Sequence, residues 1–485
     1  MSTHKSPSDN ARKVWNHEFT WTDKHFTPEE LLPLRQQTDD LVVDAVSRLQ
    51  AVAVKNKKSN TGQCFGRFDM YSVLKEYHGA DSVLQELWEE VNTVPEWVDW
   101  AQIERGQEFL YRYLIPNLTG LALQGFLGGT ATVAGGIEVL VRTGGFSIRV
   151  LPRRFVETFL WLLQITMDLK SIQPGGEGHT STARVRLLHA TVRNRLLKLM
   201  DQDPAYFDEA KYGAAVSIRD AIHATAIFCC MPLFRQLPKI GIQPRPQETE
   251  DFLALFRYIA YVMGTPDSFF DGTEQSKATI ESVMMCDLEP TESSKSIAAN
   301  FVAAVQDYPG INVSKPMIEV GCRVLSGDEL GDKMGFSRPG MFYRASFRGW
   351  CQLLVVITAI QRLSPAFDRI LMKVTSREKN NEFSYQQIAD IFSQVLKKFV
   401  LVNVFGASIL KEGNKFEFTH QPQLNKFTKR EIKTGINLSR FRPVETIGFV
   451  VFLFECLVYT LAFGMLANVL RSNGIVSQTL LNVLG

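Results

Sequence analysis

The sequence has few histidines and none of the short motifs that mark the commonest catalytic sites. Eight histidines occur among 485 residues, and no cysteine or histidine pair has the spacing of a zinc site. Three of the eight, His4, His17 and His25, lie in an N-terminal segment that we expect to be peripheral. The patterns GxxxxGK[ST], GxGxxG after a strand, GxSxG and HExxH are missing. The sequence therefore gives no sign of a P-loop enzyme, a dinucleotide-dependent enzyme, a serine hydrolase or a zinc protease.

Neither charge nor cysteine usage points to a nucleic-acid-binding or disulfide-rich protein. The 53 basic and 51 acidic residues give a net charge of +2, and no long basic stripe is interleaved with aromatic residues. The seven cysteines include no CxxC or CxxCH motif, which predicts reduced and mostly buried thiols. The polar start of the chain, MSTHKSPSDNARKVW, has no signal-peptide pattern, so we expect a protein that faces the cytosol.

Apolar residues at three- and four-residue steps are abundant, and this spacing is typical of amphipathic helices. It occurs at 29–55, 82–93, 98–115, 154–170, 183–200, 248–264, 294–306, 345–363 and 386–404. Short alternating patterns typical of strands are rare, with one at 413–419. Glycine, proline, serine and charged residues predict loops at 56–63, 171–182, 287–293 and 376–383. The sequence therefore predicts an all-α protein.

Two long hydrophobic runs raise the question of membrane insertion. Leu114–Ile137 has no charge but contains six glycines and Pro116, which favours close helix packing over an isolated span. Thr446–Leu470 is 25 residues long, carries one charge at Glu455, and follows a basic segment at 411–442. Since a charge in the middle of a span is costly, a membrane anchor and a buried core helix both remain open for this second run.

One histidine lies between two arginines on a single helical face. In ARVRLLHATVRNRL (183–196), Arg186, His189 and Arg193 are three and four residues apart. One histidine is sufficient as the axial ligand of a haem iron, and the two arginines are spaced to contact two propionate carboxylates. From the spacing alone, a core histidine on an arginine-rich helix remains the alternative.

A second polar cluster precedes this histidine, in LPRRFVETFLWLLQI (151–165). Arg154 is three residues from Glu157 and four from Thr158, so a cation, a carboxylate and a hydroxyl share one helical face. Burial would raise the pKa of such a carboxyl group, and Arg154 would lower it. The alternative is an exposed Arg–Glu pair. Glu138 lies at the edge of the glycine-rich run, where a charge is costly unless it is paired or functional.

These segments, in this order, resemble the latex-clearing protein or rubber oxygenase family, which includes a fungal endoplasmic-reticulum oxygenase of mycophenolic acid biosynthesis. The resemblance runs through IEVLVRTGGFSIRVLPRRFVETFLWLLQI, then ARVRLLHATVRNRL, then AVSIRDAIHATAIFCCMPLFRQLPKIGIQPRPQETEDFLALFRYIAYVMGTPDSFF. It covers 98–284 and extends more weakly to residue 404. The R-x-x-[KE]-T helix followed by R-x-x-H-A-x-V-R is fairly specific in combination, whereas each motif alone is weak.

The resemblance implies an all-helical, globin-like core that binds haem b without a covalent bond. His189 matches the family's proximal iron ligand, and Arg154 and Thr158 match residues of the distal side. Glu138 matches a glutamate proposed in the family as a base. The resemblance further implies that dioxygen cleaves a C=C bond of a lipophilic substrate, isoprenoid or polyketide-derived.

Two further matches and two departures concern the same region. Arg186 and Arg193 match arginines of the family's ligand helix, where they would orient the propionates or support the helix. Glu157 occupies the position of a lysine that caps the iron in the bacterial rubber enzymes, and 216–218 (VSI) replaces a more polar stretch. These departures keep two alternatives open: a haem-dependent tailoring oxidation without chain cleavage, and a haem-free carrier of a hydrophobic ligand.

We therefore expect three parts in the chain. Residues 1–97 form an N-terminal helical extension, 98–404 the haem-binding catalytic domain, and 405–485 a basic segment followed by a hydrophobic helix. The expected partners are a lipophilic small molecule and dioxygen, without nucleic acid. The expected location is the cytoplasm, or the cytosolic side of the endoplasmic reticulum membrane if 446–470 is an anchor. His223 lies in the matched region, and we expect it to be a hydrogen-bonded core histidine.

Overall fold

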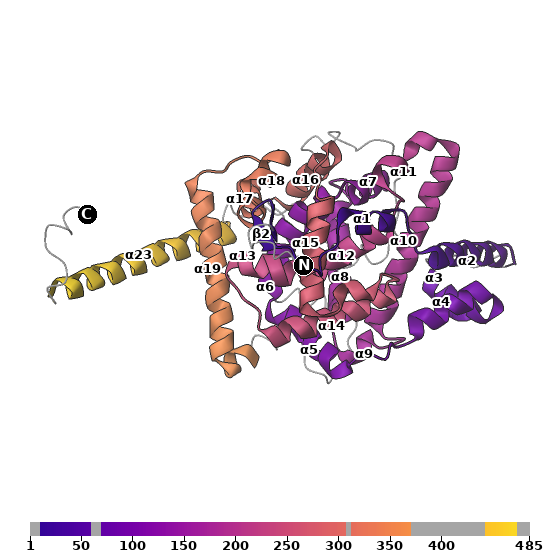
Figure 1. The fold of residues 1–485 in the computed structure, drawn as a ribbon, viewed down its shortest axis with the longest axis horizontal. Coiled ribbons are helices and arrows are strands. Elements are labelled where there is room, and N and C mark those ends of the chain that lie inside the picture. The colour runs from indigo at the N-terminus through magenta and orange to yellow at the C-terminus, as the bar shows by residue number, and fades with distance from the viewer. Residues whose placement is uncertain (1–9, 60–68, 307–311, 370–441, 473–485) are drawn as a thin grey trace, which may run out of the picture.

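The computed structural model describes residues 10–59, 69–306, 312–369 and 442–472, which form a helical body with a short β-hairpin (Figure 1). The hairpin pairs the antiparallel strands β1 (Ala11–Val14) and β2 (His17–Thr20). Everything else that is regular in the described residues is helical, so the all-α prediction is confirmed.

The helices divide between two halves of the described chain. The first half contains α1 (Pro28–Leu31), α2 (Asp40–Ser59), α3 (Met70–Tyr77), α4 (Ser82–Asn92), α5 (Trp100–Arg112), α6 (Leu114–Gly120), α7 (Ala134–Arg142), α8 (Leu151–Thr166), α9 (Leu169–Ile172), α10 (Glu177–Gln202), α11 (Glu209–Tyr212) and α12 (Ile218–Met231). The second half contains α13 (Leu237–Ile240), α14 (Pro246–Val262), α15 (Gly272–Asp287), α16 (Glu292–Val305), α17 (Lys315–Ser326), α18 (Asp328–Lys333), α19 (Met341–Leu363) and α23 (Pro443–Ser472).

The segments with helical spacing are helices in the part of the chain that the structure describes, with three corrections. The predicted loop 56–63 is wrong at its start, because α2 continues to Ser59. The segment 29–55 is interrupted at Pro33, because proline has no amide hydrogen for a helix interior. The predicted loop 171–182 is wrong in its second half, where α10 begins at Glu177. Outside the described residues lie three further predictions: the helix 386–404, the loop 376–383 and the strand 413–419.

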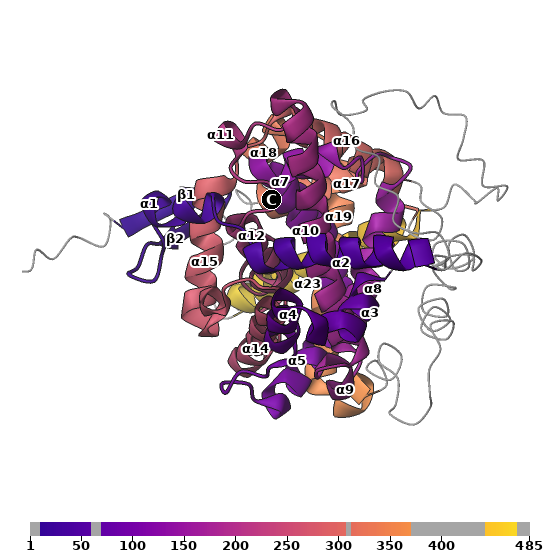
Figure 2. The ribbon, with the colours of Figure 1, turned by 90° about the vertical axis from the view of Figure 1, so that its right-hand side faces the viewer.

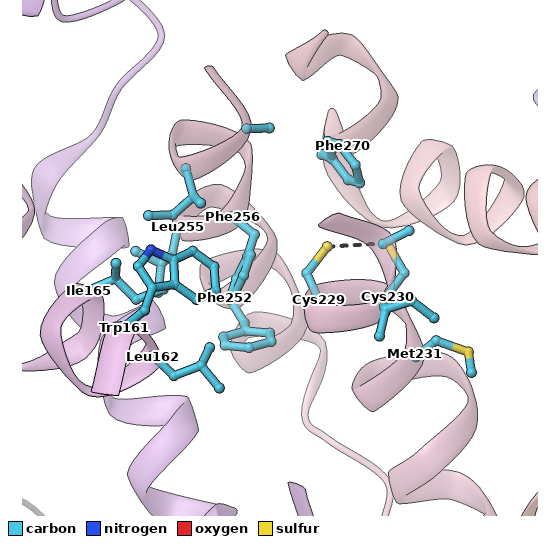
Figure 3. Packing of buried hydrophobic residues seen from close by; sticks show 14 of the residues in the cluster. Trp161, Leu162, Ile165, Cys229, Cys230, Met231, Phe252, Leu255, Phe256 and Phe270 are labelled. Carbon is cyan, nitrogen blue, oxygen red and sulfur yellow. Dashed lines mark hydrogen bonds between the residues drawn. The ribbon is translucent and has the colours of Figure 1, made fainter. Parts of the chain in front are cut away.

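The main core joins α8, α12 and α14 through aromatic side chains (Figure 3). Trp161 on α8 lies edge-on to Phe228 on α12 and to Phe256 on α14, with ring centroids 5.4 and 6.5 Å apart. Cys229 and Cys230 are buried in the same core as free thiols, as predicted. These contacts fix the second half of α8 firmly against the body.

The glycine-rich run is folded into several short elements. It forms α6, the π-helical segment η4 (Leu121–Gly129), a 3₁₀ turn and the start of α7. A Cβ at Gly120 would lie 2.6 Å from the Cβ of Gln236, and one at Gly129 would lie 2.3 Å from the Cδ1 of Ile227. No side chain fits at these distances, so the prediction of close helix packing is confirmed.

The N-terminal hairpin is attached to α15 by two histidines that share one buried carboxylate. Figure 2 shows the hairpin and α1 beside α15. Nε2 of His17 and Nε2 of His25 lie 2.8 and 3.1 Å from the two carboxylate oxygens of Glu281. Glu281 is 2% exposed, and burial raises the pKa of its carboxyl group. The expectation that His17 and His25 are peripheral is therefore wrong, because they connect the N-terminus to the core.

We predict that Glu281→Gln loosens the hairpin, because an amide carries no charge and accepts at only one of the two oxygen positions. The free energy of unfolding should fall by about 2 kcal/mol, and limited proteolysis after Arg12 or Lys13 should accelerate. Glu18→Gln is the control, since Glu18 makes an exposed ion pair with Lys13. Equal proteolysis of both variants would contradict the assigned role of Glu281.

An ionic network holds the end of α19 against α5 and α14. Beside a partly open pocket, Arg112 contacts Glu248 and Asp368, each at 3.3 Å. Arg362 on α19 donates to the hydroxyl of Tyr113 at 2.9 Å, and that hydroxyl donates to Glu248 at 2.8 Å. Burial and the neighbouring carboxylate raise the pKa of Tyr113 to about 12. The end of α19 is therefore joined to the body by contacts that do not involve α23.

The second hydrophobic run forms most of α23, which projects from the side of the body (Figure 1). Residues 443–462 have a mean hydropathy of 1.9, and 11% of this segment is buried, so its length and composition suffice to cross a membrane. Glu455 does not stand alone, because Arg348 on α19 lies 3.1 Å from it. The exposure of α23 favours the anchor interpretation over the buried core helix.

Candidate functional site

The site begins with the packing of α8 on α10. A Cβ at Gly178 on α10 would lie 2.7 Å from the Cα of Ile165 on α8, and Nε1 of Trp161 donates to Oγ1 of Thr182 at 3.1 Å. Later residues of α10 thus face earlier residues of α8, so the two helices are antiparallel. When the same pairing is extended toward the start of α8 and the end of α10, Arg154 on α8 lies level with His189 on α10.

His189 is exposed although it lies on the inward side of α10. The buried residues Arg186 and Leu196 flank it on the helix surface, whereas the outward face carries the exposed residues Arg184 and Arg195. Burial by the surrounding protein nevertheless lowers the pKa of the His189 imidazole. From this combination of accessibility and desolvation we infer that His189 lines a space inside the protein, which we call the inner hollow.

The imidazole of His189 is chemically available. Among the described residues, neither ring nitrogen has a hydrogen-bond partner. The lowered pKa keeps the ring neutral at physiological pH, which leaves a nitrogen lone pair for a metal. A neutral, accessible and unpartnered imidazole is what an axial haem ligand requires.

The opposite wall of the hollow is the first half of α8. Every residue from 152 to 160 keeps partial exposure, in contrast to the buried residues 161–163. Arg154 and Thr158 lie on the same face of α8 as Trp161, and burial lowers the pKa of Arg154. The pairing of the two helices thus places Arg154 level with His189, and Thr158 one turn further along the same face of α8.

Glu157 is held between two arginines. Nε of Arg153 donates to one carboxylate oxygen and Nη1 of Arg154 donates to the other, both at 2.9 Å. This geometry fixes the direction of the Arg154 side chain. The exposed-pair alternative does not describe it, because the side chains of Arg154 and Glu157 are 14% and 27% exposed.

The third wall comes from α12 and was missed in the sequence. Ala224 is exposed in the middle of this otherwise buried helix, and Ala221 and Phe228, three and four residues away, are half-buried. Phe228 contacts Trp161, so this stripe borders the same hollow. Alanines on an apolar helix carry no signal in a single sequence, but here their small size leaves space for a ligand.

Asp220 begins the same stripe as part of the cap of α12. Its Oδ2 accepts hydrogen bonds from the backbone N–H and the hydroxyl of Ser217, at 3.0 and 2.9 Å. Its Oδ1 points toward α7, since Cβ atoms at Gly135 and Gly136 would lie 3.6 and 3.7 Å from it. Burial raises the pKa of this carboxyl group.

Glu138 is buried on α7 and points toward α16. It lies 3.5 Å from Nη2 of Arg142 and accepts a hydrogen bond from Ser293 on α16. Among the described residues, its hydrogen-bond and ion-pair partners do not include Arg154, Glu157 or Thr158. Glu138 is thus held between Arg142 and α16, and its role as a base stays a prediction.

Arg186 connects the ligand helix to the N-terminal region. It donates to Asp39 through Nε and Nη2 at 2.6 and 3.1 Å, and Nη2 lies 2.7 Å from Glu90 on α4. The side chain is 4% exposed, and Nη1 is buried without a partner among the described residues. Of the two predicted roles, these contacts favour support of the helix over propionate binding.

We predict that Arg186→Gln lowers the free energy of unfolding by about 3 kcal/mol, because it leaves the carboxylates of Asp39 and Glu90 without their shared cation. Asp39→Asn keeps the charge of Glu90 and should cost about 1 kcal/mol. Chemical denaturation measures both changes. If Arg186 instead contacts a propionate, Arg186→Gln should shift the absorption of the haem-loaded protein, whereas Asp39→Asn should not.

Arg193 lies one turn beyond His189 and is bound more loosely. Its Nη1 donates to the backbone carbonyl of Ala215 at 2.8 Å, and the Glu209 carboxylate lies 3.8 Å from it. Burial lowers the pKa of Arg193, and its Nε is buried without a partner among the described residues. It keeps a free donor for an anionic group, so propionate binding stays a prediction for Arg193.

His223 is buried as expected, but the expectation that it is hydrogen-bonded is wrong. Both ring nitrogens lack a partner among the described residues, and the residue is 4% exposed. Burial and the nearby charge of Arg219 lower the pKa of His223 to about 3. The sequence gave no indication of this, because the helical pattern around His223 fits a bonded and an unbonded histidine equally well.

This depressed pKa makes stability sensitive to acid. In the unfolded chain the imidazole of His223 binds a proton near pH 6.5, whereas in the folded chain it stays neutral at that pH. We predict that stability falls as the pH decreases from about 6.5 and that His223→Leu removes part of this fall. The difference should reach about 2 kcal/mol at pH 5, measured by denaturant unfolding at several pH values. Parallel pH profiles of the variant and the parent would contradict the assignment.

Comparison with known proteins agrees with this geometry. A family model described as the catalytic domain of the ER-bound oxygenase mpaB/B′ and rubber oxygenase matches residues 114–356. The rubber oxygenase of Streptomyces sp. (strain K30) is 23% identical over 278 residues, which are 56% of this chain and 65% of that protein. The chain thus aligns with less than two thirds of the relative's length.

A solved structure extends the likeness to the fold. The latex clearing protein LCP in the closed state has a TM-score of 0.53 and 17% sequence identity, and the match covers 75% of this chain and 99% of that one. The matched family segment contains α8, α10, α12 and all three walls of the inner hollow. The chain belongs to the family of the ER-bound oxygenases mpaB/B′ and the rubber oxygenases.

Proposed function

We propose that this protein is a haem b-dependent oxygenase that acts on a lipophilic, isoprenoid or polyketide-derived substrate with dioxygen. The observation that carries the proposal is His189, which is neutral, accessible and unpartnered on the inward face of α10. Membership of an oxygenase family supports the reaction class, and the name of the Streptomyces relative supports a polyisoprene-like substrate.

The residues around the hollow fit a haem. His189 would hold the iron, and Arg193 has a free donor for a propionate. Ala221 and Ala224 leave a flat apolar wall, which suits a planar macrocycle or an apolar chain. Haem bound there would supply an iron that binds and activates dioxygen.

The α8 residues would then work on the side opposite the imidazole. Arg154 and Thr158 offer N–H and O–H donors to a developing oxygen charge, and the desolvated surroundings strengthen such hydrogen bonds. Glu157 fixes the direction of Arg154 through its two hydrogen bonds. An amine cannot cap the iron from this position, since a glutamate occupies it.

Proton transfer from the substrate would require a carboxylate near the hollow. Glu138 and Glu157 are the two predicted bases, and each is already paired with at least one arginine. Either carboxylate would have to lie within hydrogen-bond reach of the substrate proton that it removes. Oxidation without chain cleavage is the second candidate, and the glutamate at position 157 is the observation that favours it.

The absorption spectrum of the purified protein tests the proposal. We predict a Soret band in the oxidised and reduced parent that is lost or displaced in His189→Ala. His78→Ala is the matched control, because His78 stacks on Trp88 away from the hollow. A well-folded parent expressed with haem precursor and lacking this band would support the haem-free carrier instead.

Labelled dioxygen distinguishes the two oxidative candidates. Recovery of both oxygen atoms in the carbonyl ends of a cleaved isoprenoid supports cleavage. A product with an intact chain supports the tailoring oxidation.

The exposed helix α23 supports a location at the endoplasmic reticulum membrane, as in the ER-bound oxygenases of the family. The charge of Glu455 is compatible with this location, since Arg348 forms an ion pair with it.

A further inference from the structure

Asp220 is a half-buried carboxylate of which the cap of α12 uses only one oxygen. Its Oδ2 accepts both hydrogen bonds from Ser217. Its Oδ1 has no hydrogen-bond or ion-pair partner among the residues that the structure describes, and it remains accessible. It lies beside the first turn of α7, where Gly135 and Gly136 have no side chains to cover it. One acceptor oxygen of this carboxylate is therefore available to a ligand.

Two contacts show that α12 runs antiparallel to α10. Before α12 begins, the backbone carbonyl of Ala215 accepts a hydrogen bond from Arg193 on α10, at 2.8 Å. Further along α12, Phe228 lies edge-on to Trp161 on α8. Trp161 in turn donates to Thr182, which is eleven residues before Arg193 on α10. The start of α12 thus lies beside the later turns of α10, and Phe228 lies near the level of Thr182.

This pairing places Asp220 near the level of the proposed iron ligand. His189 follows Thr182 by seven residues, a rise of about 10 Å along α10. Seven residues back from Phe228 along α12 is Ala221, which directly follows Asp220. The free carboxylate oxygen and the imidazole therefore belong to the same layer of the helical body.

The backbone in front of the cap is strained. Val216 has a φ of 57°, a left-handed conformation that β-branched residues rarely adopt. It packs in a cluster that contains Val139 on α7 and Val192 on α10. Backbone strain persists only where the surrounding structure holds it, and it is concentrated at active sites and ligand sites. The start of α12, with Asp220, is thus fixed against the helix that carries His189.

The stripe that continues from Asp220 is apolar. Ala221, Ala224 and Phe228 form it, and none of them offers a side-chain donor to the carboxylate. Burial raises the pKa of the Asp220 carboxyl group. An acceptor oxygen in such surroundings costs free energy until a donor reaches it. A ligand that lies along this stripe gains a hydrogen bond if it brings the donor.

The charges near Asp220 favour a neutral donor over a cationic one. Arg35 and Arg219 lie near enough to favour the ionised form of the carboxyl group. Arg154 on α8 lies level with His189, in the same layer. An ammonium group at Oδ1 would be repelled by these guanidiniums, whereas a hydroxyl group would not.

We propose that Asp220 is a substrate-binding residue whose Oδ1 accepts a hydrogen bond from a hydroxyl group of the lipophilic substrate. This inference rests on the proposed function and narrows the substrate class to isoprenoid or polyketide-derived alcohols and phenols. Their hydroxyl group would lie near the level of His189, with the chain along Ala221 and Ala224. A pure hydrocarbon such as polyisoprene would leave Oδ1 without a donor.

Isothermal titration calorimetry of the full-length protein tests the proposal. The probes are geraniol and geranyl methyl ether, which share one isoprenoid chain and differ in the O–H donor. We expect the parent to bind the alcohol about tenfold more tightly than the ether, because only the alcohol donates to Oδ1. In Asp220→Asn, the amide oxygen can keep the cap while the NH₂ group replaces Oδ1, so the ratio of the two affinities should fall to about one.

Ser217→Ala is the matched control. It removes the hydroxyl group of the cap but leaves both oxygens of Asp220 in place. Thermal unfolding should show a less stable protein, whereas the ratio of the alcohol and ether affinities should stay at the value of the parent. If Ser217→Ala lowers the ratio as much as Asp220→Asn, the effect comes from the cap and the proposal is overturned.

The remaining outcomes separate this inference from the proposed function. Equal affinity of the parent for alcohol and ether would show that Asp220 only caps α12, which overturns the inference and leaves the proposed function standing. Absence of binding of either probe also overturns the inference, and the Soret band of the same sample then decides independently on the haem proposal. Tighter binding of geranylamine than of geraniol would overturn the assignment of a neutral hydroxyl group.

Discussion

The contact between Trp161 and Thr182 determines the site more than any other interaction. It joins α8 to α10 where both are well packed, and Gly178 allows the backbones to approach just before it. Beyond Trp161 toward the start of α8, the side chains lose full burial. Two helices that are tightly joined at one end and less packed at the other leave a space between them, and His189 and Arg154 face that space. The arrangement of the candidate site is thus a consequence of uneven packing along one helix pair.

Buried charge in this protein serves mainly to position elements. Arg186 fixes α10 to the N-terminal region, Glu157 fixes Arg154, and Glu281 fixes the hairpin. Removing any one of these charges would leave its partner desolvated without a compensating charge, which would lower the stability of the fold. Among the described residues that sequence analysis selected, only His189 is desolvated, accessible and without a partner, which is why the proposed ligand role falls on it.

The sequence predicted the helical class and most helices because the apolar spacing is strong along the chain. It also selected Arg154 and His189, which the structure places at one level, and Thr158, which lies one turn from Arg154 on the same face of α8. The sequence failed where tertiary contacts decide the structure. The glycines before His179 begin a helix because Gly178 packs against α8. His17 and His25 become structural through Glu281, a residue more than 250 positions away. Ala224 and the two unbonded nitrogens of His223 are properties of the assembled helices, so no local pattern reveals them.

The antiparallel pairing of α8 and α10 has a consequence for how the chain tolerates change. The level of His189 relative to Arg154 is set by the contact at Trp161 and Thr182, so the length of the connection at 167–176 does not enter it. A single residue inserted between Thr182 and His189, in contrast, would rotate the imidazole by about 100° around the helix axis. A residue inserted in the connection would therefore leave the level of His189 unchanged, whereas these two helical turns have to keep their residue count.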